Sequence, residues 1–290
     1  MRFPLAILGI TAMAGSALAD TRLASWDVDL TRDGPGLLLR DILRESDDIL
    51  AVVDAIVAAK ADVLLLTSFD YDAGGAALGA FADLLAARGA DYPLRIAQAT
   101  NRGLPSGQDL NGNGRLGEAE DAYGWGRFYG EGAMALLSRL PLTGDLRDHT
   151  ADQGRLASSG LWVVPLGPLD VIAFAATTPA FGNETRNAAE IAQAAALIEG
   201  RFVLIGKPNL DPAAGAGDRA VMASLLADSR LQDPLAGQPT AHWPDPIGAL
   251  RVDYILPAAE ILVAGAGVIP HDNAAFGAHS LVYIDIADVP

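Results

Sequence analysis

The sequence contains no cysteine among its 290 residues. No disulfide can therefore hold the chain together, and no thiolate can bind a metal ion. The Gly-x-Ser-x-Gly turn of serine hydrolases and the His-Glu-x-x-His pair of zinc proteases are also missing. Basic residues are few, with 20 Lys and Arg against 36 Asp and Glu, and the net charge is −16. Because nucleic-acid affinity comes largely from Lys and Arg that displace counterions, long nucleic acid is not an expected partner.

Apolar runs of membrane-spanning length are missing as well. The apolar stretch 3–13 follows Arg2 and leads to Ala17-Leu18-Ala19, a small-x-small pattern. This order is typical of a secretory signal peptide, and the run is too short to cross a bilayer. We expect residues 1–19 to be removed on export. Residues 20–290 are expected to form a single domain without a membrane span, secreted or periplasmic.

Segments typical of strands and of helices alternate along the chain. Ser46 to Asp48 resembles a helix start, and apolar residues then recur at helical spacing from Ile49 to Val57. Further helices are predicted at 76–88, from Asn187 to Gly200 and at 218–226. Strands are predicted at 21–29, 63–66, 94–97, 133–138, 161–165, 171–175, 202–205, 251–256, 261–268 and 280–286. The mixture favours two packed sheets flanked by helices.

A loop rich in Gly, Asn and Asp, residues 101–132, contains the pattern of a twelve-residue calcium loop at 109–120. Gly114 stands at position six, where such loops turn sharply, and position seven contributes only its backbone carbonyl. The residues at positions one, three, five, seven and twelve are Asp109, Asn111, Asn113, Arg115 and Glu120. We expect a structural Ca²⁺ site. The alternative is a flexible loop, and the non-helical segment 103–108 argues against a paired EF-hand.

Six segments, in the same order and over nearly the whole chain after residue 19, resemble one family. They are Leu23-Ala-Ser-Trp-Asp27-Val, the strand 62–72, Gly132-Ala-Met-Ala-Leu-Leu-Ser-Arg-Leu-Pro-Leu142, Ile205-Gly-Lys-Pro-Asn-Leu-Asp-Pro212, Leu250-Arg-Val-Asp-Tyr-Ile-Leu-Pro257 and Gly277-Ala-His279. They are similar to the endonuclease/exonuclease/phosphatase family of DNase I-like hydrolases. The resemblance implies an α/β (α+β) fold, a four-layer α/β/β/α sandwich.

The chemistry that the resemblance implies is altered in this chain. The family holds a divalent metal, usually Mg²⁺, on a Glu that ends the second strand. An Asp in an Asp-x-Asn loop activates water, and a terminal Asp-His pair assists. The positions of the metal Glu, the water-activating Asp, the terminal Asp, a further His and an opening Asn are Ser68, Lys207, Ala278, Ala176 and Asp27. The family residues that persist are Asn209, Asp253 and His279, where Asp253 orients His279.

These replacements predict a protein without metal-dependent hydrolysis, since Mg²⁺ requires anionic oxygen ligands and is not expected here. The former cleft would bind a small phosphorylated ligand or a protein. The alternative is a phosphodiesterase or phosphatase with a relocated metal site, built from Asp27, Asp29, Asp70 and Asp72. We interpret His149, His242 and His271 as surface residues.

Two of the replacements are reciprocal. A neutral Asn has become Asp27 and an acidic Asp has become Lys207, at positions that line the same pocket in the family. We predict that the ammonium of Lys207 approaches Asp27 within about 4 Å or through one water. It would then replace the charge of the lost metal. The alternative is a lysine that extends into solvent.

Overall fold

Two β-sheets stacked face to face form the centre of the protein. A computed structural model describes residues 20–271 and 276–287. The first sheet has six strands in the order β12-β13-β1-β2-β4-β3. β1 and β2 run parallel, and the other neighbours run antiparallel. The strands are β1 (Thr21–Leu30), β2 (Val63–Phe69), β3 (Leu94–Ile96), β4 (Ala133–Ser138), β12 (Val263–Ile269) and β13 (Leu281–Ile286).

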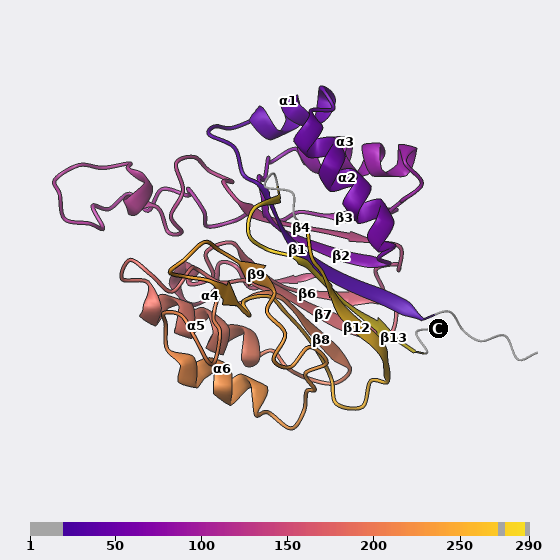
Figure 1. The fold of residues 1–290 in the computed structure, drawn as a ribbon. Coiled ribbons are helices and arrows are strands. Elements are labelled where there is room, and N and C mark those ends of the chain that lie inside the picture. The colour runs from indigo at the N-terminus through magenta and orange to yellow at the C-terminus, as the bar shows by residue number, and fades with distance from the viewer. Residues whose placement is uncertain (1–19, 272–275, 288–290) are drawn as a thin grey trace, which may run out of the picture.

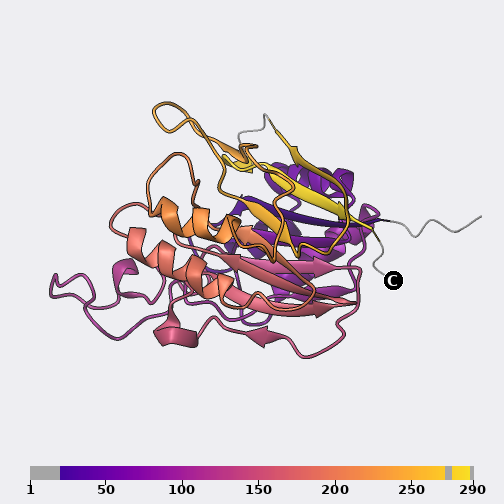
Figure 2. The same cartoon turned by 90° about the horizontal axis from the view of Figure 1, so that it is seen from below.

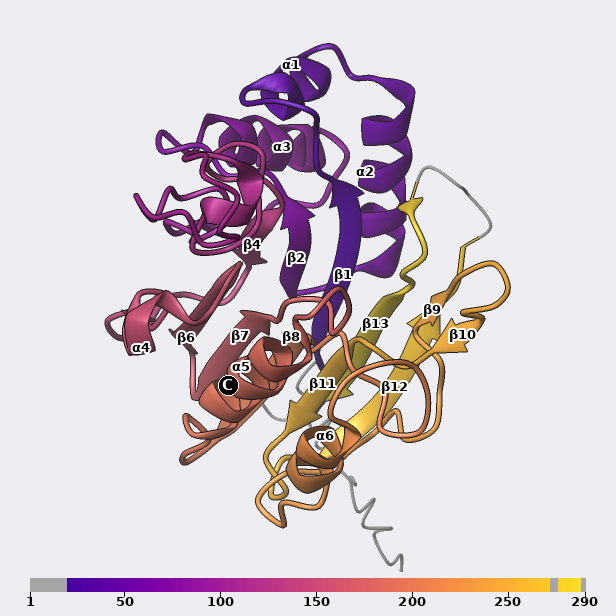
Figure 3. The same ribbon diagram turned by 90° about the vertical axis from the view of Figure 1, so that its left-hand side faces the viewer.

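The second sheet has five strands in the order β11-β8-β7-β6-β5, of which β7 and β8 are parallel. Its strands are β5 (Arg147–Asp148), β6 (Gly160–Leu166), β7 (Leu169–Ala175), β8 (Phe202–Lys207) and β11 (Tyr254–Pro257). A separate short hairpin pairs β9 (Ala241–His242) with β10 (Ala249–Leu250). In Figure 3 this hairpin lies to the right of β11 and β13.

Helices cover the outer face of each sheet. Figure 1 shows α1, α2 and α3 above the first sheet and α5 and α6 below the second. Figure 2, a view from below, shows α5 and α6 lying over the second sheet and running roughly along its strands. The helices are α1 (Leu37–Leu43), α2 (Asp47–Ala59), α3 (Ala76–Ala87), α4 (Asp152–Arg155), α5 (Glu184–Ala195) and α6 (Arg219–Leu226), with a 3₁₀ turn η1 (Ala119–Asp121). This is the α/β/β/α sandwich that the resemblance implies.

Strand β2 shows why its sheet is an inner layer of the sandwich, because both faces of this strand are buried. Val63 and Leu65 belong to the core shared with the second sheet, whereas Leu64 and Leu66 belong to the core under α1, α2 and α3. A strand covered on both faces needs apolar residues at successive positions, and the run from Val63 to Leu66 provides them. The same two-sided covering is what a central layer of a four-layer sandwich requires.

One helix differs from its prediction. The helix expected from Asn187 to Gly200 is α5, which begins three residues earlier and ends at Ala195. Asn187 does not cap it, because its Nδ2 donates to the carbonyls of Thr177 and Pro208, each at 2.7 Å. Asn is a frequent N-cap residue, so the sequence favoured a cap. Here it instead ties α5 to the two loops that follow β7 and β8.

The carboxyl ends of the parallel strands meet at one end of the sandwich. The long loop between β3 and β4, magenta in Figure 1, projects from this end. Ser68, the residue before the last of β2, has φ 56° and lies beside a bulge between β1 and β2. Gly206, with φ 142°, precedes the last residue of β8, and a Cβ there would lie 1.9 Å from the carbonyl oxygen of Phe174. Only glycine permits this approach.

The predicted signal peptide, residues 1–19, lies outside the described residues and stays a prediction. Among the helices of the described ranges, none is long and apolar enough to cross a membrane.

Candidate functional site

Three side chains from three strands meet at the carboxyl end of the sandwich. Lys207, the last residue of β8, places its Nζ against the Oδ2 of Asp27 on β1, forming an ion pair. The same Nζ lies 3.2 Å from the Oγ of Ser68, and that hydroxyl donates to Asp27 Oδ2 at 3.0 Å. The approach of Lys207 to Asp27 that the reciprocal replacement predicts is therefore present. The contact joins the first sheet to the second.

The charge of Asp27 depends on these contacts. Asp27 is only 6% exposed, and burial by itself raises the pKa of a carboxyl. The attraction of Lys207 and His279, together with the hydrogen bonds from Lys207 and Ser68, acts in the opposite direction and holds the pKa of Asp27 well below its usual range. Asp27 is thus an ionised, buried carboxylate whose countercharge is an ammonium group.

A second charged pair lies beside the first. The Nδ1 of His279 lies 2.8 Å from Oδ2 of Asp253, which also accepts a hydrogen bond from the Thr240 hydroxyl at 3.0 Å. Thr240 Oγ1 in turn accepts the backbone N–H groups of Val252 and Asp253. Burial lowers the pKa of His279, but the charge of Asp253 and its hydrogen bond outweigh burial and raise it. Asp253 orients the imidazole, as the resemblance implies.

The side chain of Asn209 is hydrogen-bonded to the backbone. Asn209 has φ 57°, and its Nδ2 donates to the carbonyl of Ala176 at 2.7 Å. Ala176 follows β7 and donates its own N–H to the carbonyl of Lys207. The carbonyl of Ala278 accepts the N–H of His242 in the β9 hairpin. Asn209 and Ala176 thus stabilise the loops that present Lys207.

Two of the four carboxylates named for a relocated metal site, Asp70 and Asp72, accept backbone N–H groups. Asp70 accepts the backbone N–H groups of Arg32 and Gly132 at 2.9 and 2.8 Å, and burial raises its pKa to about 6. Asp72 accepts two backbone N–H groups at the start of α3. Asp29 is exposed and donates its own N–H to Asp27 at 3.3 Å. Each of Asp70 and Asp72 therefore has a structural role.

The predicted calcium loop is folded by its own side chains. Asp109 accepts the backbone N–H groups of residues 112–114 at 2.7 to 3.1 Å. Asn113 donates to Glu118 at 2.5 Å, and Glu120 accepts the indole N–H of a tryptophan outside the loop at 3.4 Å. Asp109, Asn111, Asn113, Arg115 and Glu120 stay a predicted calcium ligand set.

A family model matches most of the chain. The model of the endonuclease/exonuclease/phosphatase family matches residues 24–275. The chain belongs to this family. The match includes Asp27, Lys207 and Asp253, whereas His279 lies after its last residue. No curated protein matches the sequence significantly.

Solved structures have the same fold at low identity. An endonuclease/exonuclease/phosphatase from Beutenbergia cavernae is 19% identical, with a TM-score of 0.65 over 93% of this chain and 72% of that one. The 3'-5' exonuclease NExo from Neisseria meningitidis is 15% identical, with a TM-score of 0.59 over 92% and 100%. An AP endonuclease from Archaeoglobus fulgidus is 11% identical, with a TM-score of 0.62 over 93% and 100%. These likenesses establish the fold alone.

Sequence reasoning missed four residues of the endonuclease/exonuclease/phosphatase site. Thr240 holds Asp253, and the ring of Trp243 meets the His279 ring edge-on at 5.2 Å between centroids. Arg102 reaches the same end of the sandwich from the long loop, and the sequence carries no motif that marks any of these three. His271, interpreted as a surface residue, is instead half-buried, and its Nε2 lies 2.8 Å from the carbonyl of His279.

Proposed function

We propose that this family member is an exported protein that binds a ligand through the former active-site cleft and does not hydrolyse phosphoesters with a divalent metal. The observation that carries the proposal is the ion pair between Lys207 and Asp27. An ammonium group occupies the position from which the family's water-activating carboxylate acts. It supplies the positive charge that would otherwise come from the metal.

The donor set at this position does not fit Mg²⁺. A hard divalent cation needs several anionic oxygens, and the resemblance places Ser68, Lys207 and Ala278 where the family has carboxylates. The Lys207 ammonium would also repel a cation bound to Asp27. Within residues 20–271 and 276–287, no group of three or more His, Asp or Glu side chains lies together in a way that could hold a metal ion.

The alternative proposal is a hydrolase with a relocated metal site. It requires Asp70 and Asp72 to leave the backbone N–H groups that they now accept. Each rearrangement would leave buried or helix-terminal donors without an acceptor, which costs about 1–3 kcal/mol for a buried group. This energetic cost favours the binding function.

The net charge of the chain limits the class of ligand that we propose. With a net charge of −16, the surface repels long polyanions, while Lys207 and His279 lie at the end of the sandwich that corresponds to the family's active site. The proposed ligand is therefore a small phosphorylated molecule, or a protein that presents such a group, rather than long nucleic acid. The 3'-5' exonuclease and AP endonuclease activities belong to the Neisseria and Archaeoglobus proteins.

An assay of hydrolysis tests the proposal. The protein is incubated with a chromogenic phosphomonoester and a phosphodiester in Mg²⁺, Mn²⁺ or Ca²⁺, and we expect no turnover above a blank. A variant that restores the family carboxylates, Ser68→Glu with Lys207→Asp and Ala278→Asp, is run beside it. Activity of the unaltered protein that EDTA abolishes and that His279→Ala removes would overturn the proposal in favour of the hydrolase.

Calcium is proposed as a structural cofactor of the long loop. The support is that Asp109 already folds residues 112–114 into the tight turn that the twelve-residue pattern requires. Ca²⁺ that binds only the folded loop raises the melting temperature by mass action. We expect this rise in the unaltered protein and its loss in Glu120→Gln, with Glu199→Gln on another surface as the control. An equal rise in Glu120→Gln would place the ion elsewhere.

A further inference from the structure

A cavity of about 530 Å³ lies between three segments that the proposed function does not use. The long loop forms one wall with residues from 106 to 110 and with Tyr123, α4 and the residue after it form a second, and the start of α5 forms the third. The volume is in the range of small-molecule binding sites. The described residues that line the cavity include none of Asp27, Lys207 and His279, so it is separate from the former active-site cleft.

The charged side chains that line this cavity are both basic. The chain has 36 Asp and Glu against 20 Lys and Arg, yet the lining contains Arg155 and Arg186 and no acidic residue. Apolar side chains line it as well, among them Leu110, Tyr123 and Leu156. Leu110 is 53% exposed, so its apolar surface is open to a ligand. Positive and apolar walls in an acidic protein complement an anion that has an apolar body.

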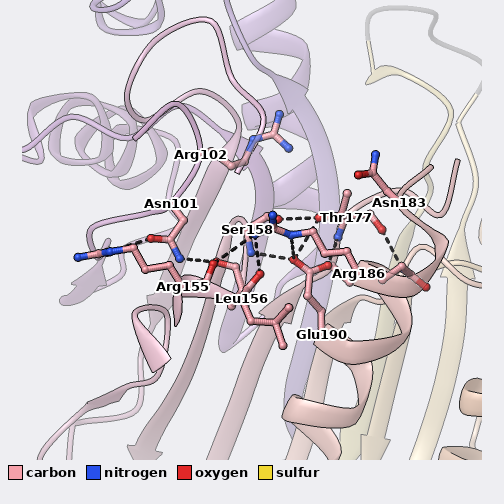
Figure 4. A network of polar contacts seen from close by, with 12 residues as sticks. Asn101, Arg102, Arg155, Leu156, Ser158, Thr177, Asn183, Arg186 and Glu190 are labelled. Carbon is pink, nitrogen blue, oxygen red and sulfur yellow. Dashed lines mark hydrogen bonds and ion pairs between the residues drawn. The ribbon is translucent and has the colours of Figure 1, made fainter. Parts of the chain in front are cut away.

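Arg186 has its charge compensated and supports the wall of the cavity. Its Nε lies 3.5 Å from Oε1 of Glu190, a buried carboxylate at the centre of the network in Figure 4. Its Nη2 donates to the carbonyls of Arg155 and Leu156 at 3.2 and 2.7 Å. Arg186 therefore positions the backbone that carries Arg155.

Arg155 has no acidic partner of its own. Its Nη1 donates to Oδ1 of Asn101 at 3.0 Å, and its guanidinium lies 5.4 Å from the centre of the Tyr123 ring. Within residues 20–271 and 276–287, no Asp or Glu forms an ion pair with it, and its Nε and Nη2 donate no hydrogen bond. In Figure 4 its guanidinium lies at the edge of the network, away from Glu190, with a dashed line to Asn101. The N–H groups of Nε and Nη2 form one edge of the guanidinium, and this edge is available to a ligand.

The backbone that presents Arg155 is strained and is held in place. Gln153, Gly154 and Arg155 have φ of 50°, 70° and 66°, a left-handed conformation that is costly for residues with a Cβ. Such conformations persist where the surrounding structure holds them, and they gather at ligand sites. Asn101, which is fully buried, donates through Nδ2 to two carbonyls on either side of this segment, at 2.6 and 2.8 Å. The guanidinium is therefore fixed before any ligand arrives, which lowers the entropic cost of binding.

We infer that this cavity is a binding site for a small organic carboxylate with an aromatic or other apolar body. The free edge of Arg155 has two parallel N–H donors, which match the two oxygens of a carboxylate. One uncompensated positive charge balances one negative charge, whereas a phosphomonoester carries close to two at neutral pH. The apolar body packs against Leu110, Tyr123 and Leu156. This site goes beyond the proposed function, because it uses no residue of the cleft.

Calorimetric titration with 2-naphthoate and the neutral 2-naphthamide tests the inference, because the two probes share an aromatic body and differ in charge. We expect the unaltered protein to bind 2-naphthoate roughly tenfold more tightly, through the charge-assisted contact with Arg155. Arg155→Gln should lose this preference and leave binding of the amide within about threefold. Arg155→Lys keeps the charge but not the fork and should give an intermediate preference. Arg147→Gln, on the exposed strand β5 outside the cavity, is the matched control and should behave like the unaltered protein.

Phenyl phosphate separates this site from the cleft, since it belongs to the ligand class proposed there. We expect saturating phenyl phosphate to leave the binding of 2-naphthoate unchanged, and displacement would overturn the inference by placing the carboxylate in the cleft. No binding of 2-naphthoate, equal binding of the two probes, or an unchanged preference in Arg155→Gln would also overturn it, and none of these results affects the proposed function. Should Arg155→Gln lose its fold by circular dichroism, Arg155→Lys decides, and an unchanged preference in that variant overturns the inference.

Discussion

The two charged pairs, Asp27–Lys207 and Asp253–His279, differ in the groups that hold their side chains in place. Asp253 and His279 are part of a backbone network, because Thr240 binds Asp253 while its neighbours pair the β9 hairpin with the residues before β13. Asp27 and Lys207 have one further side-chain partner, Ser68, and join strands of opposite sheets. Asp253 and His279 keep the family's residues, whereas Asp27 and Lys207 replace them.

The Asp253–His279 pair therefore has a structural role that does not depend on metal chemistry. Removing His279 or Asp253 would disturb the hydrogen bonds that attach the hairpin, so the pair has a structural role whatever its chemistry. The side chain of Lys207 instead contacts only other side chains, those of Asp27 and Ser68. The persistence of His279 in a member of this family is therefore weak evidence for hydrolysis.

The largest effect is expected from separating Asp27 and Lys207. Asp27→Asn leaves an ammonium group that is only 14% exposed without a countercharge. We expect a loss of about 3 kcal/mol in the free energy of unfolding, measured by chemical denaturation. Adding Lys207→Met should restore most of it, because neither charge is then left buried alone.

The exposed pair Arg88–Asp54 provides the matched control for this comparison. Asp54 is 67% exposed, so Asp54→Asn should cost less than about 1 kcal/mol. If Asp27→Asn costs no more than Asp54→Asn, the Asp27–Lys207 pair contributes no more than a surface pair. Its proposed role as a replacement for the metal charge would then be wrong.

A smaller effect is expected from loosening the second pair. Thr240→Val removes the acceptor for two backbone N–H groups and the donor to Asp253. We expect a loss of about 2 kcal/mol in the free energy of unfolding, since buried donors are left unsatisfied. Thr240→Ser keeps the hydroxyl and should cost clearly less. Equal losses in both variants would mean that the methyl group, not the hydrogen bonds, matters.

Ser68→Ala tests how far the first pair depends on its hydroxyl. The variant loses the hydrogen bond to Asp27 and the acceptor for Lys207, and we expect a loss of about 1 kcal/mol. The same substitution should cost less in the Asp27→Asn, Lys207→Met background. An identical cost in both backgrounds would show that Ser68 acts independently of the pair.

The smallest effect is expected from pH, because burial opposes the gain that His279 draws from Asp253. The pKa of His279 is raised in the folded protein, so its contribution to stability is complete below the ordinary value of about 6.5 and is lost as pH rises through the folded pKa. An NMR titration of the imidazole should give a lower pKa in Asp253→Asn. Asp145→Asn, on an exposed loop, should leave it unchanged.

The sequence alone predicted the sandwich and the contact of the first pair. The apolar run from Val63 to Leu66 predicts a strand covered on both faces, and local patterns of this kind depend only on neighbouring residues. Asp27 stands where the family has an Asn, and Lys207 stands where the family has an Asp. These two replacements predict a contact between Asp27 and Lys207, because the resemblance places both positions in one pocket. The sequence left a solvent-exposed Lys207 as the alternative, and the contact of the two side chains in the structure decided between them.

Only the tertiary structure decided the partners of residues that carry no local pattern. Asp70 and Asp72 could have been metal ligands by residue type, but their carboxylates accept hydrogen bonds from nearby backbone N–H groups. Asn187 has the chemistry of a cap, yet two loops distant in sequence bind it instead. Thr240 reaches Asp253 from the segment before β9, 13 residues earlier in the chain. Hydrogen bonds between such segments depend on the packing of the whole chain, which no window of the sequence contains.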